Sequence, residues 1–146
     1  MDALIPLDPV HGAVAAEIHR RCFAEPWDAA ALADLLAMPG AFGFLAGGDD
    51  PVGFVLARIA ADEAEILTIA VLPDARRTGQ ASRLLTTAAS AAQSRGATVL
   101  FLEVEADNSP ALALYEGQKF HNVGRRAHYY GQNRHAIVLS RNLAAD

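Results

Sequence analysis

Apolar residues in the first half of the chain recur first with helical spacing and then with strand spacing. Asp28 has the side chain of a helix N-cap, and Pro39 with Gly40 ends the segment that follows it. Gly47 to Asp50 form a turn signal between two apolar segments, which predicts a β-hairpin. The expected elements are a helix over 11–23, a short helix between Asp28 and Pro39, and strands over 42–46 and 52–59.

The second half begins with an apolar segment that Pro73 and Asp74 end. A polar, glycine-containing stretch follows and leads into a long helical pattern, for which Gly96 is the expected C-terminal cap. Ser109 can cap a later short helix, with Pro110 in its first turn. The expected elements are strand 65–71, helix 80–94, strand 98–104, helix 109–116 and strands 120–123 and 136–140.

This order of elements predicts an α/β chain with one mixed sheet. A strand, a helix and a second strand in succession form a right-handed crossover between parallel strands, here over 65–104. The 146 residues fit one domain, residues 1–146, and 52% hydrophobic against 20% charged residues is enough for a packed core. We therefore expect helices on the faces of a single sheet.

Charge and cysteine content exclude several functions. Twelve Lys and Arg against 17 Asp and Glu give a net charge of −5, which disfavours direct binding to nucleic acid. The single cysteine, Cys22, cannot form an internal disulfide or a thiolate metal cage. The five histidines lack metal-ligand spacing, so we expect no metal and place them at the surface or in loops. Without a signal-peptide pattern or an apolar stretch of about 20 residues, a cytoplasmic protein off the membrane is expected.

The polar stretch Arg76-Arg77-Thr78-Gly79-Gln80-Ala81 carries the most specific chemistry. A strand that leads through it into a helix presents backbone N–H groups at the positive end of a helix dipole, and its small residues let a ligand approach. The stretch therefore predicts a pyrophosphate site, although an ordinary polar loop that caps a helix would have the same sequence. Neither of the two commoner phosphate-loop motifs is present, which excludes a P-loop NTPase and disfavours a dinucleotide-binding fold.

Three motifs in order resemble the GNAT acetyltransferase superfamily. They are the loop after the apolar strand, then Leu102-Glu103-Val104, then the segment from Asn108 to Glu116. The resemblance implies a GNAT fold, with a mostly antiparallel mixed sheet whose central parallel strands splay apart, and acetyl-CoA as co-substrate. Within the superfamily, Pro26-Trp27, Glu103, Tyr115 and Tyr129-Tyr130 make the chain similar to enzymes that acetylate the amino terminus of a small-subunit ribosomal protein.

The resemblance also implies where acetyl-CoA binds. The backbone of one strand would pair with the pantetheine arm, the loop would surround the pyrophosphate, and Asn108 would hydrogen-bond the pantetheine. Trp27, Tyr129 and Tyr130 would line a groove for a peptide terminus, although packing under two loops suits them nearly as well. The full cofactor set is Ile69, Ala70, Val71, Arg76, Arg77, Thr78, Gly79, Gln80, Ala81, Ser82 and Asn108.

Two side chains would carry the chemistry. An α-amine is largely protonated near neutral pH and needs a base, for which Glu103 is the candidate; Glu105, on the same face of the strand, is its competitor. Tyr115 is the candidate acid for the leaving thiolate, and core packing is the alternative role of its ring. Cys22 could suggest a covalent acetyl-enzyme, but a buried small apolar side chain fits its place better.

The chain departs from the family pattern after Tyr115. Relatives usually have glycine directly before the phenylalanine, whereas this sequence has Gly117-Gln118-Lys119-Phe120, so Lys119 takes a glycine position and the turn beside Tyr115 could differ. Two alternatives to a ribosomal acceptor stay open. One is acetylation of another amine, such as a lysine side chain, a polyamine or a small molecule. The other is a non-catalytic CoA-binding domain, which the presence of both Glu103 and Tyr115 disfavours.

Overall fold

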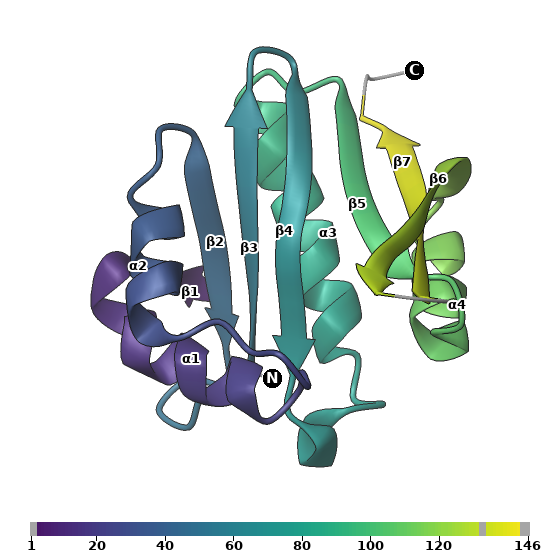
Figure 1. The fold of residues 1–146 in the computed structure, drawn as a ribbon. Coiled ribbons are helices and arrows are strands. Elements are labelled where there is room, and N and C mark those ends of the chain that lie inside the picture. Colours follow the sequence, from purple (N-terminus) through teal and green to yellow (C-terminus); the bar gives the residue numbers. More distant parts are fainter. Residues whose placement is uncertain (1–2, 132–133, 144–146) are drawn as a thin grey trace.

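The computed structural model describes residues 3–131 and 134–143, without the side chains of 126–131 and 134. Its sheet has the strand order β1-β2-β3-β4-β5-β7-β6 (Figure 1), and every neighbouring pair is antiparallel except β4 and β5. The elements are β1 (Ile5–Pro6), η1 (Pro9–His11), α1 (Gly12–Arg20), α2 (Ala29–Leu36), β2 (Ala41–Ala46), β3 (Gly53–Ala60), β4 (Glu63–Val71), η2 (Pro73–Ala75), α3 (Gln80–Ser94), β5 (Val99–Glu105), α4 (Ser109–Gly117), β6 (His121–Gly131) and β7 (Arg134–Asn142).

Helices cover both faces of this sheet, which confirms the predicted fold class. We call the face that carries α1 and α2 the front face, and the face that carries α3 the back face (Figure 1). On the back face, Leu84 and Leu85 of α3 pack with Leu100 and Leu102 of β5 in the larger buried cluster. Each such side chain contributes about 1.5–3 kcal/mol when fully buried. The front face has a smaller cluster, in which Leu32 of α2 is fully buried.

Local sequence explains most element boundaries. The Asp28 side chain accepts a hydrogen bond from the Ala31 N–H at 2.8 Å and caps α2, as predicted. The cap of α4 was wrongly assigned to Ser109, because Asn108 Oδ1 accepts the Ala111 N–H at 3.2 Å. Strand β1 was not predicted, since two residues give no periodicity. The last two strands are also longer than expected.

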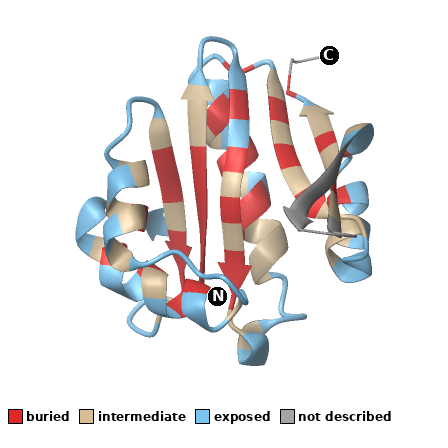
Figure 2. Cartoon of the chain, viewed as in Figure 1, coloured by how far each residue is buried: buried red, intermediate tan, exposed pale blue. Residues whose placement is uncertain are grey.

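Strand β4 contains a bulge that turns its side chains over. Its register with β3 runs from Leu56↔Thr68 to Ala57↔Ile66, so Leu67 is the extra residue. Ile66, before the bulge, lies in the back-face cluster, whereas the bulge residue Leu67 packs against the front-face cluster. Figure 2 shows buried residues concentrated in these central strands. The bulge thus places two consecutive residues, Leu67 and Thr68, on the side of α1 and α2, because Thr68 bonds to α1.

Candidate active site

The two central strands part after a short parallel stretch. Strands β4 and β5 pair at three positions, from Glu63↔Val99 to Glu65↔Phe101, and diverge beyond them (Figure 1). Residues Ile66–Val71 therefore have a side that β5 does not pair, which we call the open edge of β4. Main-chain groups on such an edge can bind a ligand that contains amides.

The register of β3 and β4 determines which groups face the open edge. The Leu72 N–H donates to the Val52 carbonyl, so Leu72 and Ala70, two residues apart, both point their backbone groups toward β3. Ile69 and Val71 alternate with them and present N–H and C=O to the open edge. This register favours Ile69 and Val71 over Ala70 as the residues whose backbone groups face a ligand at the open edge.

The loop between β4 and α3 has a backbone shaped for close approach. Arg77 and Gly79 adopt left-handed conformations, with φ of 65° and 82°. A Cβ added to Gly79 would have no other atom within 4 Å, so the space beside this backbone is open. The Arg83 N–H donates to the Gly79 carbonyl, and the N–H groups of the first turn before it have no partner within the helix. This start of α3 suits an anionic group such as a pyrophosphate.

Several of the predicted binding residues also hold the loop itself. Arg76 Nε donates to the Val71 carbonyl at 2.9 Å, and the Thr78 hydroxyl donates to the Ala75 carbonyl at 2.5 Å. The Ser82 hydroxyl accepts from Gln118 Nε2 at 2.6 Å. An open hollow of about 360 Å³ adjoins this loop and is lined by Gly79, Ser82, Arg83, Thr86 and Thr87. Its own hydrogen bonds therefore hold the loop in place, with an open hollow beside it.

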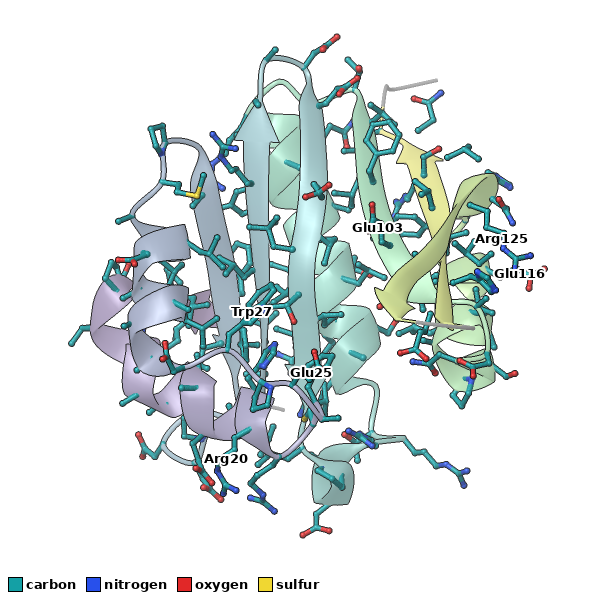
Figure 3. All side chains as sticks on the ribbon, in the orientation of Figure 1. Arg20, Glu25, Trp27, Glu103, Glu116 and Arg125 are labelled. Carbon is teal, nitrogen blue, oxygen red and sulfur yellow. The ribbon has the colours of Figure 1, made fainter. Side chains whose placement is uncertain are left out.

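Glu103 lies on β5 beyond the last residue paired with β4. Leu102 and Val104 are buried in the back-face cluster, so the intervening Glu103 points to the front face, and Glu105 does the same. Figure 3 shows Glu103 on the same side of the sheet as Trp27, with β4 between them. Both carboxylates lie next to the divergence of the strands, and both have interaction partners.

Tyr115 lies in α4 and is 7% exposed. It packs in the back-face cluster with its ring edge-to-face against Phe120, at 5.9 Å between centroids. The turn after it is intact despite the displaced glycine: the Phe120 N–H donates to the Tyr115 carbonyl and the Lys119 N–H to the Glu116 carbonyl. These two bonds form a Schellman motif, and Lys119 takes its left-handed position with φ of 69°.

Trp27 lies in the segment between α1 and α2 and is 37% exposed. Its backbone N–H donates to His19 Nδ1 at 3.1 Å. His19 is 3% exposed, so its assignment to the surface was wrong. The missed signal was helical spacing, because Gly12, Ala15 and Ile18 are the other buried positions of α1 and His19 lies on the same side of the helix. Tyr129 and Tyr130 belong to β6, and their side chains lie outside the described residues.

Cys22 follows α1 and is half-buried against the front-face cluster. Its Sγ donates to the Val71 carbonyl at 3.4 Å, the same oxygen that Arg76 binds. Among the described residues, no group of three or more His, Cys, Asp or Glu side chains could hold a metal ion. None of their helices is long and apolar enough to cross a membrane.

Comparison with known proteins identifies this arrangement. The model of the acetyltransferase (GNAT) family matches residues 13–120. The chain belongs to the GNAT acetyltransferase family. As a GNAT acetyltransferase it is an acyltransferase, and acetyl-CoA is its acetyl donor. The loop before α3 and the open edge of β4 offer the N–H and C=O groups that such a donor needs.

Individual relatives are similar over most of the chain. The [ribosomal protein bS18]-alanine N-acetyltransferase of Escherichia coli K12 is 31% identical over 130 residues, which cover 89% of this chain and 88% of that protein. The crystal structure of the E. coli ribosomal-protein-S18-alanine N-acetyltransferase matches with a TM-score of 0.92 and 28% identity, covering 100% of this chain and 96% of that one. A mycothiol acetyltransferase of Clavibacter michiganensis is 37% identical over 106 residues, 73% of this chain and 32% of that protein.

Proposed function

We propose that this GNAT enzyme transfers an acetyl group to the N-terminal α-amine of a protein, and that the acceptor is a small-subunit ribosomal protein. The E. coli relatives named for this activity on bS18 support the acceptor, since they match nearly the whole chain. The net charge of −5 suits an acceptor with basic residues near its terminus. Replacing those basic residues in a peptide acceptor should raise its KM.

The reaction proceeds in a ternary complex. Ile69 and Val71 align the pantetheine along the open edge of β4, and Asn108 contributes its remaining amide N–H groups, since its Oδ1 caps α4. Residues 76–82 hold the pyrophosphate with backbone N–H groups and with the guanidinium groups of Arg76 and Arg77. Holding both substrates in one cleft supplies much of the rate by proximity.

Glu103 and Tyr115 move the protons. Glu103 takes a proton from the ammonium group of the acceptor, directly or through water, so that the free amine attacks the thioester carbonyl carbon. The new C–N bond forms as the C–S bond breaks, and Tyr115 donates its phenolic proton to the departing thiolate. The nitrogen then loses its second proton, which restores the Tyr115 phenol. A phenol with a reference pKa of about 10 can do this with a modest energy cost, because the thiol lies near 8.5.

One observation carries this proposal: the parallel pairing of β4 and β5 ends at Glu65↔Phe101, directly before the stretch that carries Glu103. The divergence gives the thioester a backbone edge on one strand and a carboxylate on the other. Trp27 lies on the same face as that carboxylate (Figure 3), and we assign it to the wall of the acceptor groove.

The test compares two glutamates on one face of β5. Glu103→Gln should lower kcat by about 10²–10⁴-fold, because it removes the base and keeps the shape of the side chain. Binding of acetyl-CoA, measured by calorimetry, should stay nearly unchanged. Glu105→Gln is the matched control and should keep most of the activity. Full activity of Glu103→Gln, or a loss confined to Glu105→Gln, would remove Glu103 from this role.

The mycothiol acetyltransferase relative favours a second candidate, transfer to the amine of a small molecule. The two candidates differ in the acceptor and share the donor site. Thiol release should be measured with a panel of N-terminal peptides, a lysine side-chain peptide, a polyamine and small amines. If thiol is released faster with small amines than with every peptide, the acceptor is a small molecule and not a protein N-terminus. Comparing N-terminal acetylation by mass spectrometry in cells with and without the gene would identify the natural acceptor.

A further inference from the structure

A buried histidine that the proposed chemistry does not use connects three elements of the front face. His19 of α1 is 3% exposed, and both of its ring nitrogens have partners. Nδ1 accepts the Trp27 N–H at 3.1 Å, and Nε2 lies 3.2 Å from the Thr68 hydroxyl of β4. Because an N–H can only donate, Nδ1 carries no proton and the imidazole is neutral, with its proton on Nε2.

Aromatic rings hold this imidazole on several sides. It stacks on Phe23 with centroids 4.2 Å apart and on Trp27 at 5.1 Å, and Phe54 of β3 lies 6.2 Å away. Phe23 and Trp27 are themselves 42% and 37% exposed, although they flank a buried ring. The segment that carries Trp27 is neither helix nor strand, so its position depends on contacts such as these.

The other end of this connection reaches the donor side of the site. Thr68 directly follows the bulge residue Leu67 and directly precedes Ile69, whose backbone faces the open edge. A shift of Trp27 relative to Thr68 is therefore a shift of the acceptor wall relative to the thioester. Small displacements of this kind are costly in a two-substrate reaction, because reacting atoms must meet at about 3–3.5 Å.

We propose that His19 is a positioning residue for acetyl transfer: by bonding Trp27 and Thr68 at once, it fixes the wall of the acceptor groove against strand β4. This role rests on the proposed function, because it takes Trp27 as part of the acceptor groove. His19 touches neither substrate and moves no proton in the reaction.

The chain offers a direct probe of this role, since Trp27 is its single tryptophan. In His19→Ala the fluorescence of Trp27 should shift to longer wavelength and become more accessible to acrylamide. The KM of an N-terminal peptide should rise about fivefold, the effect of one lost hydrogen bond, while the KM of acetyl-CoA stays within error. Arg20→Ala is the control on the same helix, since Arg20 lies at the surface with Glu17 and should leave both readouts unchanged (Figure 3).

Two conservative variants separate the two bonds. In His19→Asn the Oδ1 takes the place of Nδ1 and can accept the Trp27 N–H. The Trp27 emission should therefore return to its wild-type wavelength, and the peptide KM should return most of the way to its wild-type value. In His19→Gln the Nε2 takes the place of the ring Nε2 and keeps only the bond to Thr68, so Trp27 should stay displaced. Thr68→Val should raise the peptide KM less than His19→Ala does, and Thr68→Ser should reverse that rise.

Several results would overturn the proposal. One is an unchanged emission and peptide KM in His19→Ala; another is an equal rise in the KM of acetyl-CoA, which indicates general damage. If His19→Ala does not fold, the peptide KM and the Trp27 emission of His19→Asn, His19→Gln and Thr68→Val decide. Equal values in all three variants overturn the proposal. If the wild type acetylates none of the peptides, the proposed function fails, and the fluorescence of Trp27 still decides the role of His19.

Discussion

The donor side and the acceptor side of this site are built in different ways. In the proposed function, the donor side uses mainly one continuous stretch, from the end of β4 through the loop to the start of α3, with Asn108 as the one addition from a separate element. The proposed acceptor side depends on side-chain contacts between separate elements, because His19 of α1 bonds both Trp27 and Thr68 of the donor strand β4. A site made from consecutive residues leaves a motif in the sequence, whereas a site made from separate elements does not. If this difference holds, variants should change the two sides of the site independently.

After Glu103→Gln, the largest expected effect concerns both sides of the site, because it removes the proton that the departing thiolate receives. Tyr115→Phe should lower kcat by about 10²-fold, since it removes the phenolic proton and keeps the ring that packs against Phe120. The KM of the peptide should change little. Rates from thiol release, with thermal unfolding as a check on the fold, measure this. Full activity at an unchanged melting temperature would leave Tyr115 a core residue only.

A smaller effect is expected from the donor loop alone. Gly79→Ala places a methyl group in the open space beside the loop and in a left-handed conformation, with φ of 82°. The KM of acetyl-CoA should rise about tenfold, because the backbone no longer approaches the phosphates freely, and stability should fall by about 1 kcal/mol. The peptide KM should stay constant. A variant that changed only the peptide KM would contradict the division between the two sides.

The acceptor side should show a pH dependence of stability that the donor loop lacks. Burial lowers the pKa of His19 from its ordinary 6.5, so the unfolded chain binds a proton there at a higher pH than the folded chain does. This contribution to stability is therefore full above pH 6.5 and is lost as the pH falls through the lowered folded pKa. The neighbours in contact with the ring, namely Phe23, Trp27, Phe54 and Thr68, carry no charge.

Urea unfolding between pH 8 and pH 5 measures this dependence. The wild type should lose more stability over this range than His19→Gln, which has no titrating group at that place. Subtracting the two curves removes the contributions of the other histidines. Parallel curves would show that the ring is not held in its neutral form.

The same division explains what could be predicted from the sequence. The order of the elements, the splayed parallel pair and the loop before α3 follow from periodicity, turn residues and a family motif. The bulge at Leu67 could not be predicted, because an apolar strand shows no sign of which residue lacks a partner. The burial of His19 was missed because a buried histidine needs a polar partner, and that partner, Thr68, lies 49 positions away in the sequence.

Ala70 illustrates the limit on the donor side. The family resemblance places the ligand along three consecutive residues, but the direction of each backbone group depends on the register with β3. Register is set by turns and by packing against other strands, which a single strand does not contain. The sequence therefore predicts a binding strand but cannot tell which of its backbone groups face the open edge.

The smallest expected effect concerns the turn after α4, where the sequence departs from the family pattern. Lys119 holds the left-handed position of a Schellman motif, which suits glycine better, so Lys119→Gly should stabilise the protein by about 0.5–1 kcal/mol. Lys119→Ala is the matched control, because it removes the same charge without freeing the backbone, and it should give no gain. Chemical unfolding measures both. Equal stabilities of the glycine and alanine variants would mean that the turn relaxes around Lys119 without strain, and kcat should be unchanged in either case because the two turn hydrogen bonds after Tyr115 remain.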